Sequence, residues 1–377
     1  MPYCRICKSE LTKPLLELKN VPAAAQNMPS TGEELQKDRG IDLAICQCLN
    51  CGVLQHTSEP VPYYREVIRA SGVSAEMKSF RLEQFKKWTA DYKLAGKKVF
   101  EAGCGRGEYL RLMQSSGVEA CGVEYGSSAV NICRASGLQV FQNFFQTGKE
   151  KLPGAPYDGF FILNFLEHIP DLPAFLQGIR NNLAPGAAGI VEVPNLDMIL
   201  ENSQLTEFSV EHLFYFTAES LSNLLHNQGF EVRRCRSIWY DYIISAEVVK
   251  RECQDLSGCA EIAGNITNQL DRFVSAHRKT VFWGAGHQAL TTLAITGMDE
   301  RKIAFVVDSS AEKQGRFTYT THIPIVSPEH LADSDADAVV VACGGYSDEV
   351  VQILKKNFPE RFAIAVLREN TIEIIKA

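Results

Sequence analysis

The feature that most constrains the fold is a glycine-rich turn at residues 101–107, which read Glu-Ala-Gly-Cys-Gly-Arg-Gly. The residues before the turn, 98–101, have β-strand character, and those after it, 108–115, carry apolar side chains at helical spacing. Glycines at such a junction let the backbone turn tightly and let a ligand lie against it. The turn therefore predicts a doubly wound α/β sheet that binds a ligand at the carboxyl ends of its strands.

The alternation of strand-like and helical patterns continues and then recurs in a second region of the chain. The first region has predicted strands at 98–101, 120–124, 138–141, 159–163 and 189–193. A polar stretch from 251 to about 268 follows, and the second region has predicted strands at 280–283, 304–307, 338–342 and 362–366. This arrangement predicts two Rossmann-like α/β domains in succession.

The N-terminal region has a different character, because five of the twelve cysteines lie in the first 51 residues. Two Cys-x-x-Cys pairs stand out, formed by Cys4 and Cys7 and by Cys48 and Cys51. Two such pairs supply the four thiolates of a structural zinc site, which stabilises a segment too small to build a large core. Free thiols are the alternative, and we take Cys46 as a buried thiol. We expect a zinc-binding domain at 1–75, a central domain at 76–249 and a C-terminal domain at 250–377.

Composition excludes several classes of protein. Apolar residues make up 45% of the chain and charged residues 22%, which is typical of a globular protein rather than a disordered one. The net charge of −7 argues against nucleic acid as a partner. The longest apolar run is too short to span a bilayer, and the N-terminus lacks the pattern of a secretory signal. We therefore expect a cytoplasmic protein that acts on a small molecule, with no membrane partner.

The glycine turn resembles the first motif of the class I S-adenosylmethionine-dependent methyltransferases, in which an acid precedes three alternate glycines. A dinucleotide-binding turn normally reads Gly-x-Gly-x-x-Gly. Glu124 ends the next predicted strand, where a carboxylate can accept hydrogen bonds from both ribose hydroxyls of a nucleoside. The resemblance implies that Glu101 helps to hold the methionine part, that Glu124 binds the ribose, and that the remaining cofactor residues are Gly103, Gly105, Asn143, Phe144 and Asn164.

Two histidines follow predicted strands of the same region. His168 lies just past the fourth strand, and His212 lies past the fifth, next to Glu211. Ligands of an open α/β sheet bind at these strand ends, and a histidine titrates in the range that suits a general base. Two structural interpretations stay open at this point: His168 as a cap for backbone groups, and Glu211 with His212 as a structural pair.

A second glycine turn, at residues 284–286, resembles a nucleotide-binding turn, and Asp308 ends the strand that follows it. Ala289 stands where a dinucleotide-binding turn would have its third glycine. A nicotinamide site and a purely structural turn both remain open.

The order of these parts resembles the deoxysugar C-methyltransferases, and the resemblance covers nearly the whole chain. Its most specific segments are 48–55, 211–217 and 313–325. It implies methyl transfer to carbon of a nucleotide-linked 4-keto-6-deoxy sugar through an enolate. His212 would be the base, oriented by Glu211, and His168 would stabilise the enolate oxygen. The C-terminal domain would help to enclose the sugar nucleotide.

The chain departs from this family just before the Glu-His pair. Ser209 and Val210 stand where the family tends to carry Tyr-His, and that tyrosine helps to hold the pyrophosphate. Tyr63 or Tyr64 is the candidate for the other pyrophosphate contact. The alternatives are O- or N-methylation of a sugar or another small metabolite, and a non-catalytic protein that binds S-adenosylmethionine or NAD.

Overall fold

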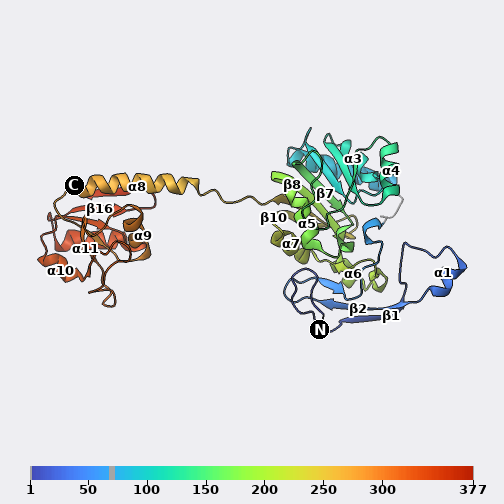
Figure 1. The fold of residues 1–377 in the computed structure, drawn as a ribbon, viewed down its shortest axis with the longest axis horizontal. Helices are drawn as coiled ribbons and strands as arrows, with labels where there is room; N and C mark the ends of the chain where they lie inside the picture. Colours follow the sequence, from blue (N-terminus) through green and yellow to red (C-terminus); the bar gives the residue numbers. More distant parts are fainter. Residues whose placement is uncertain (1, 68–72, 377) are drawn as a thin grey trace. The chain divides into compact units, whose positions relative to one another are not determined.

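The computed structural model describes residues 2–67 and 73–376. Contacts divide the chain into two compact units, Met1–Glu252 and Cys253–Ala377, and we describe each unit by itself (Figure 1). The predicted boundary between residues 249 and 250 lies close to this division, while the boundary at 75 falls within the first unit. The three-domain division stays a prediction.

The first unit is built on a seven-stranded sheet with the order β10-β11-β8-β7-β4-β5-β6. Strands β6, β5, β4, β7 and β8 run parallel to one another, and β11 is antiparallel to both β8 and β10. In chain order the strands are β4 (Lys98–Ala102), β5 (Glu119–Glu124), β6 (Val140–Gln142), β7 (Tyr157–Leu163), β8 (Leu183–Pro194), β10 (Phe230–Ile238) and β11 (Ile243–Lys250). The five predicted strands of this region are confirmed, and the antiparallel pair at the far edge is additional.

Helices cover both faces of this sheet, because alternate side chains of its central strands point to opposite faces. Phe100 and Ile162 belong to the core beneath α5 (Leu172–Asn181) and α7 (Ala218–Asn227). Val99 and Phe161 belong to the core beneath α2 (Ala75–Asp91), α3 (Glu108–Gln114) and α4 (Ser127–Ala135). In Figure 1, α3 and α4 lie on one side of β7 and β8, with α5 and α7 on the other. The first unit therefore has the Rossmann-like fold expected of a class I methyltransferase core.

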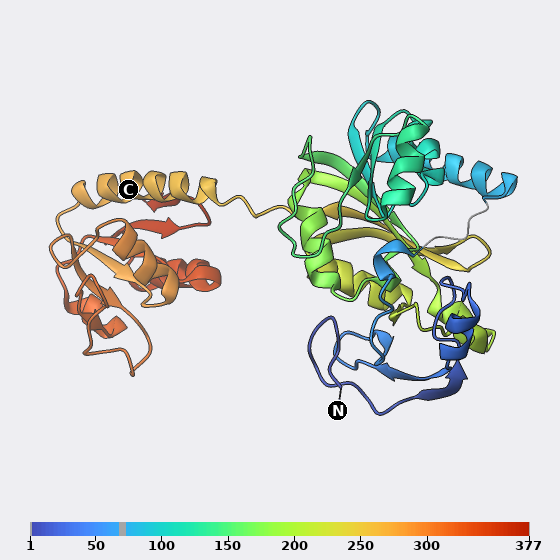
Figure 2. The same ribbon diagram turned by 45° about the vertical axis from the view of Figure 1, so that its right-hand side comes forward.

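A second sheet of the first unit has the order β1-β2-β3-β9, with all neighbours antiparallel. Strands β1 (Leu16–Val21), β2 (Ile41–Gln47) and β3 (Leu54–His56) come from the N-terminal region, which also has helix α1 (Gly32–Lys37). Strand β9 (Phe214–Tyr215) comes from the central region. Side chains of β2 and β9 share an apolar cluster with α6 (Leu196–Glu201), and Figure 2 shows the blue N-terminal strands against this yellow-green segment. The cysteine-rich region is thus joined to the core by strand pairing.

The second unit has a six-stranded sheet with the order β14-β13-β12-β15-β16-β17. The strands run parallel except for β17, which is antiparallel to β16. The strands are β12 (Thr280–Trp283), β13 (Ile303–Val307), β14 (Ile325–Val326), β15 (Ala338–Val341), β16 (Ala363–Leu367) and β17 (Ile372–Lys376). The helices are α8 (Ser257–Ser275), α9 (His287–Ile295), α10 (Pro328–Asp333) and α11 (Ser347–Asn357). The second predicted Rossmann-like domain is confirmed.

The polar stretch expected between the two regions is mostly helical. Helix α8 begins at Ser257 and buries Ile266, Leu270 and Phe273 in the core of the second unit. These three apolar residues recur at helical spacing, so one narrow apolar face packs while the rest of the helix stays polar.

Candidate active site

The glycine turn ends β4 and has the geometry that only glycine adopts readily. Gly103, Gly105 and Gly107 have φ values of 72°, 55° and 82°. A Cβ atom on Gly103 would lie 2.5 Å from the ring of Phe165, and one on Gly107 would lie 2.4 Å from Leu138. A Cβ atom on Gly105 would meet nothing within 4 Å. The outer glycines therefore permit close packing, and the middle one leaves its backbone open to a ligand.

Glu124 joins the end of β5 to this turn. Its carboxylate accepts hydrogen bonds from the backbone N–H groups of Gly105 (2.9 Å) and Gly126 (2.8 Å). Glu101 lies on the adjacent strand, paired with Gly122, and is fully buried. The fold thus brings together the two acids and the glycines that were predicted to contact the cofactor.

Asn143 and Phe144 follow β6, beside Glu124. The Asn143 N–H donates to the carbonyl oxygen of Glu124 (3.0 Å), and the Phe144 ring packs edge-on against Tyr125, with 6.3 Å between centroids. Together with Gly103 and further aromatic rings they line a cavity of only about 10 Å³, which we call the aromatic slot. It is lined by Ala102, Gly103, Val123, Tyr125, Asn143, Phe144, Phe145, Phe165 and Phe175.

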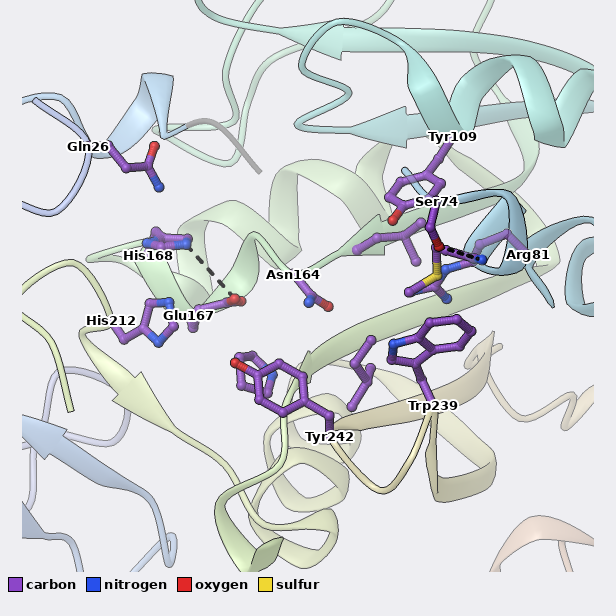
Figure 3. Close-up of a pocket in the computed structure, with 14 residues that line it drawn as sticks. Gln26, Ser74, Arg81, Tyr109, Asn164, Glu167, His168, His212, Trp239 and Tyr242 are labelled. Atoms are coloured by element: carbon purple, nitrogen blue, oxygen red, sulfur yellow. Dashed lines mark hydrogen bonds and ion pairs between the residues drawn. The ribbon is translucent and has the colours of Figure 1, made fainter. Parts of the chain in front are cut away.

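A larger cavity of about 480 Å³ opens at the carboxyl ends of β7 and β8, and we call it the histidine cavity. Figure 3 shows His168 and His212 next to Glu167 and Asn164, with Arg81 and Tyr109 elsewhere on the wall. Asn164, which follows β7 directly, has a positive φ of 46° and lines this cavity. The polar and aromatic side chains that line the cavity are Gln26, Ser74, Arg81, Tyr109, Asn164, Glu167, His168, His212, Trp239 and Tyr242.

His168 is held in one tautomer. Its Nδ1 lies 2.8 Å from the backbone carbonyl oxygen of Glu211, which only accepts hydrogen bonds, so Nδ1 carries the proton. Burial, together with the neighbouring His212, lowers the pKa of His168 to about 3. The ring is therefore neutral at pH 7, and its Nε2 presents a lone pair 3.9 Å from a Glu167 carboxylate oxygen. In this tautomer Nδ1 caps a backbone carbonyl and Nε2 can accept a hydrogen bond, while the predicted role of His168 at an enolate oxygen stays a prediction.

His212 packs edge-on against His168, with ring centroids 4.9 Å apart. Burial lowers the pKa of His212, while the carboxylates of Glu207 and Glu211 act in the opposite direction. A neutral imidazole on the wall of the cavity can accept a proton from a bound substrate.

The Glu211 carboxylate is hydrogen-bonded to the N-terminal region, and its predicted role in orienting His212 stays a prediction. Its Oε1 atom accepts hydrogen bonds from the N–H groups of Ala25 (2.8 Å) and Gln26 (2.9 Å) and from the Tyr63 hydroxyl (2.5 Å). Within the described residues, its carboxylate makes no hydrogen bond to His212 that would orient that ring. These hydrogen bonds connect the N-terminal region to the loop that carries His212.

The two tyrosines proposed as pyrophosphate ligands are engaged elsewhere. Burial and the Glu211 carboxylate raise the pKa of Tyr63 to about 12, so its hydroxyl keeps its proton and donates it to Glu211. Tyr64 packs edge-on against Phe144, at 6.0 Å between centroids. Neither tyrosine is among the described residues that line the histidine cavity.

Sequence reasoning missed a buried ion pair on the cavity wall. Arg81 Nη1 lies 2.5 Å from Glu192 Oε2, and their side chains are 2% and 0% exposed. Gln84 and Ser245 donate to the other Glu192 oxygen, at 2.6 Å and 2.9 Å. Removing either charge would leave the other buried and unpaired. The sequence feature that could have indicated this ion pair is Glu192, a carboxylate within an otherwise apolar strand.

The four predicted metal ligands come together. The sulfur atoms of Cys4, Cys7, Cys48 and Cys51 all lie within 4.8 Å of one another, at the spacing expected of a tetrahedral zinc site. Cys4 Sγ also accepts hydrogen bonds from the Ile6 N–H (3.4 Å) and the Gln55 amide (3.1 Å), which favour a thiolate. The donor set therefore fits zinc. Cys46 is buried apart from this cluster, as expected.

The second glycine turn repeats much of the geometry of the first. A Cβ atom on Gly284 would lie 2.7 Å from the carbonyl oxygen of Ala342, so the glycine permits close packing of two strand ends. The Asp308 carboxylate accepts hydrogen bonds from the N–H groups of Ala285 (2.7 Å) and Ser310 (2.9 Å) and pairs with the Lys313 ammonium (3.1 Å). Burial alone would raise the pKa of Asp308, but these partners lower it. Apart from the ion pair to Lys313, these contacts match those of Glu124, so a nicotinamide site and a purely structural turn both stay open.

Across residues 2–67 and 73–376, no helix combines the length and the apolar character that crossing a bilayer requires.

The sheet order, the glycine turn and Glu124 together define a class I S-adenosylmethionine-dependent methyltransferase core. Residues 71–234 match a methyltransferase domain family, and residues 257–364 match the C-methyltransferase C-terminal domain family. The chain thus has a methyltransferase domain followed by a C-methyltransferase C-terminal domain.

The chain is similar to several named methyltransferases. The C-methyltransferase NovU of Streptomyces niveus is 25% identical and is matched over 92% of this chain and 91% of that protein. A ubiquinone biosynthesis O-methyltransferase of Marinobacter nauticus is also 25% identical, over 42% of this chain and 74% of its own. Among solved structures, the magnesium protoporphyrin IX methyltransferase of Synechocystis PCC 6803 is 18% identical, covering 48% of this chain and 90% of that one, with a TM-score of 0.37.

Proposed function

We propose that the protein transfers a methyl group from S-adenosylmethionine to a carbon atom of a nucleotide-linked 4-keto-6-deoxy sugar. The observation that carries the proposal is the pair of neutral imidazoles, His168 and His212, on the wall of a 480 Å³ cavity beside the glycine turn. An O-methyltransferase shares the same core, and methylation at carbon also needs a neutral base placed next to the acceptor to form an enolate.

We assign the cofactor to the residues around the glycine turn. Gly105 offers open backbone, Glu124 offers its carboxylate at the end of β5, and Asn143 and Phe144 lie at the aromatic slot, where the adenine would bind. Glu101, Gly103 and Asn164 complete the proposed site. S-adenosylmethionine supplies a methyl group on a sulfonium, which a carbon nucleophile can take.

The histidines act on the acceptor. The hydrogen at C3 of a 4-keto sugar is acidic because the resulting carbanion is delocalised onto the ketone oxygen. We assign its removal to His212: the proton passes to an imidazole nitrogen, and the C–H electron pair becomes the enolate. The ring of His168 lies 4.9 Å from that of His212, measured between centroids, and its Nε2 can accept a hydrogen bond from the acceptor.

The acceptor class rests on the resemblance in the order of parts and on the matched C-methyltransferase C-terminal domain. The Tyr63 hydroxyl is hydrogen-bonded to Glu211, and the Tyr64 ring packs against Phe144 of the aromatic slot. We therefore do not assign the pyrophosphate to either side chain.

The test is hydrogen exchange in heavy water. The protein, saturated with S-adenosylhomocysteine so that no methyl transfer occurs, is incubated in D₂O with dTDP-4-keto-6-deoxyglucose. We expect mass spectrometry to show deuterium at C3 above the enzyme-free rate, and no such gain with His212→Ala. The corresponding UDP, GDP and CDP sugars identify the nucleotide.

Two results would contradict the proposal. Methylation of a hydroxyl or amine without C3 exchange would make the protein an O- or N-methyltransferase. Exchange lost in His168→Ala but retained in His212→Ala would exchange the two proposed roles.

A further inference from the structure

Arg65 lies outside the core but reaches the proposed adenine site. It belongs to the 3₁₀ helix η1 (Tyr64–Glu66), in the segment that leads from the N-terminal region. Its guanidinium carbon is 5.0 Å from the ring centroid of Tyr64, 5.2 Å from that of Tyr125 and 5.5 Å from that of Phe144. One guanidinium thus contacts three aromatic rings, which is the geometry of cation–π attraction.

Two hydrogen bonds hold the guanidinium in place. Its Nε donates to the Tyr64 hydroxyl (3.0 Å), and its Nη2 donates to Gln146 Oε1 (2.9 Å). Gln146 follows Phe144 by two residues, so the arginine is bound to the same loop that carries the slot's aromatic ring. Arginine is suited to this position because its group is planar, stacks on rings and donates in several directions.

Two of the rings that Arg65 contacts, those of Tyr125 and Phe144, line the aromatic slot. The slot measures about 10 Å³, close to the smallest cavity that holds one water molecule. A purine base enters only if these rings move apart, and a base that enters between them is placed within reach of the guanidinium.

We propose that Arg65 is a cofactor-binding residue that stacks on the adenine of S-adenosylmethionine. The inference rests on the proposed function, since it takes the aromatic slot as the adenine site. A guanidinium is attracted to the electron-rich face of a planar base, as it is to an aromatic side chain. The adenine site then includes a residue supplied by the N-terminal region as well as residues of the sheet.

This position also links the two ligand sites. Tyr63, two residues before Arg65, donates its hydroxyl to Glu211, the neighbour of His212. The short segment 63–65 therefore contacts both the adenine site and the loop that carries the proposed base.

The test is calorimetric titration of the full chain with S-adenosylhomocysteine. We expect Arg65→Ala to weaken binding about tenfold, and Arg65→Lys, which keeps the charge but not the plane, to weaken it about threefold. Arg233→Ala, on the exposed β10 at the opposite edge of the sheet, is the control and should bind as the wild type does. The melting temperature of each variant without ligand confirms that it is folded.

Two further measurements distinguish the loss of a contact to the adenine from a general destabilisation of the fold. Adenosine, which has the base but not the amino acid part, should lose affinity by the same factor as S-adenosylhomocysteine. In turnover, the KM for S-adenosylmethionine should rise while kcat stays close to that of the wild type.

The outcomes are distinguishable. Wild-type affinity in Arg65→Ala would overturn the role of Arg65 and leave the methyltransferase proposal standing. A wild-type protein that does not bind S-adenosylhomocysteine would overturn the proposed function itself. If Arg65→Ala does not fold, the folded variants Arg65→Lys and Arg65→Gln take its place. Wild-type affinity for S-adenosylhomocysteine in both of them would overturn the inference. A smaller loss of affinity in Arg65→Lys than in Arg65→Gln would support it.

Discussion

The two units contain the same local arrangement, a strand followed by a glycine turn with an acid at the end of the next strand. The contacts of the glycines and of the two acids can therefore be compared directly. In the first unit Glu124 bonds to backbone N–H groups of the turn and of α4, and Gly105 faces open space. In the second, Asp308 accepts the equivalent hydrogen bonds from Ala285 and Ser310, and Gly286 also faces open space. Asp308 is in addition paired with the Lys313 ammonium. The two turns therefore share their backbone geometry, so the geometry of a glycine turn and its acid defines a fold but does not by itself define a ligand.

The largest difference we expect between the units is their dependence on metal. Structural zinc supplies on the order of 10 kcal/mol of folding free energy in small zinc domains, and the four-cysteine cluster lies in the first unit. A strong chelator should lower the melting temperature of the first unit and leave that of the second unchanged, as resolved by calorimetry.

Metal analysis supplies the control for that experiment. Purified protein should contain one zinc per chain. Cys48→Ser should lose it and Cys46→Ala, outside the cluster, should keep it. A folded wild-type protein without metal would contradict the structural role.

Next in size is the effect of removing the proposed base. We expect His212→Ala to lower kcat by about 100- to 10,000-fold, because general base catalysis contributes that much. Binding of S-adenosylhomocysteine should be unchanged. The matched variant is His287→Ala, which follows the second glycine turn and should have wild-type kcat; a large loss there would show that the second turn takes part in the reaction.

The two acids provide a direct comparison of cofactor binding. Glu124→Ala should weaken S-adenosylhomocysteine binding by about 10- to 100-fold, since hydrogen bonds to a charged group are worth about 1.5–3 kcal/mol each. Asp308→Ala should lower the stability of the second unit without changing this affinity. If titration shows that both variants lose the same affinity for S-adenosylhomocysteine, the two turns do not differ in cofactor binding.

The smallest effect we predict is a sensitivity of the first unit to acid. Burial lowers the pKa of His168 to about 3 and that of His56 to about 4, from an ordinary value of 6.5. Between the folded and ordinary values the unfolded chain binds more protons, so stability falls as the pH drops below about 6.5. Each histidine contributes at most about 1.4 kcal/mol per pH unit.

Urea unfolding at pH 7 and pH 5 measures this slope. His56 donates from Nε2 to the carbonyl oxygen of Val210 (3.0 Å), and His56→Gln keeps an N–H donor that does not titrate. The variant should lose less stability at pH 5 than the wild type; an unchanged slope would mean that His56 does not contribute.

The sequence predicted the central strands because each has enough apolar residues to be recognised on its own. Val99 and Phe100, for example, enter cores on opposite faces of one sheet. Strand β9 was not predictable in this way, because two residues have no period and its pairing with β3 depends on a partner far away in the chain. Helix α8 was missed because its apolar face is narrow.

The candidate site shows the same limit. The glycine turn, its acids and both histidines were found because local spacing places them at strand ends. The hydrogen bonds from Ala25, Gln26 and Tyr63 to Glu211 join segments that no local pattern connects. The Arg81–Glu192 pair likewise joins a helix to a strand, so sequence spacing could not pair them.

The pairing of β9 with β3 also has a consequence for synthesis. Leu54 and Gln55 are made early, but their partners Tyr215 and Phe214 leave the ribosome only after most of the first unit has been translated. Until then β3 has an unpaired edge, which is the kind of surface that pairs with a wrong strand. A nascent chain released before residue 214 would therefore expose an open sheet edge next to its cysteines, and only a completed core would close it.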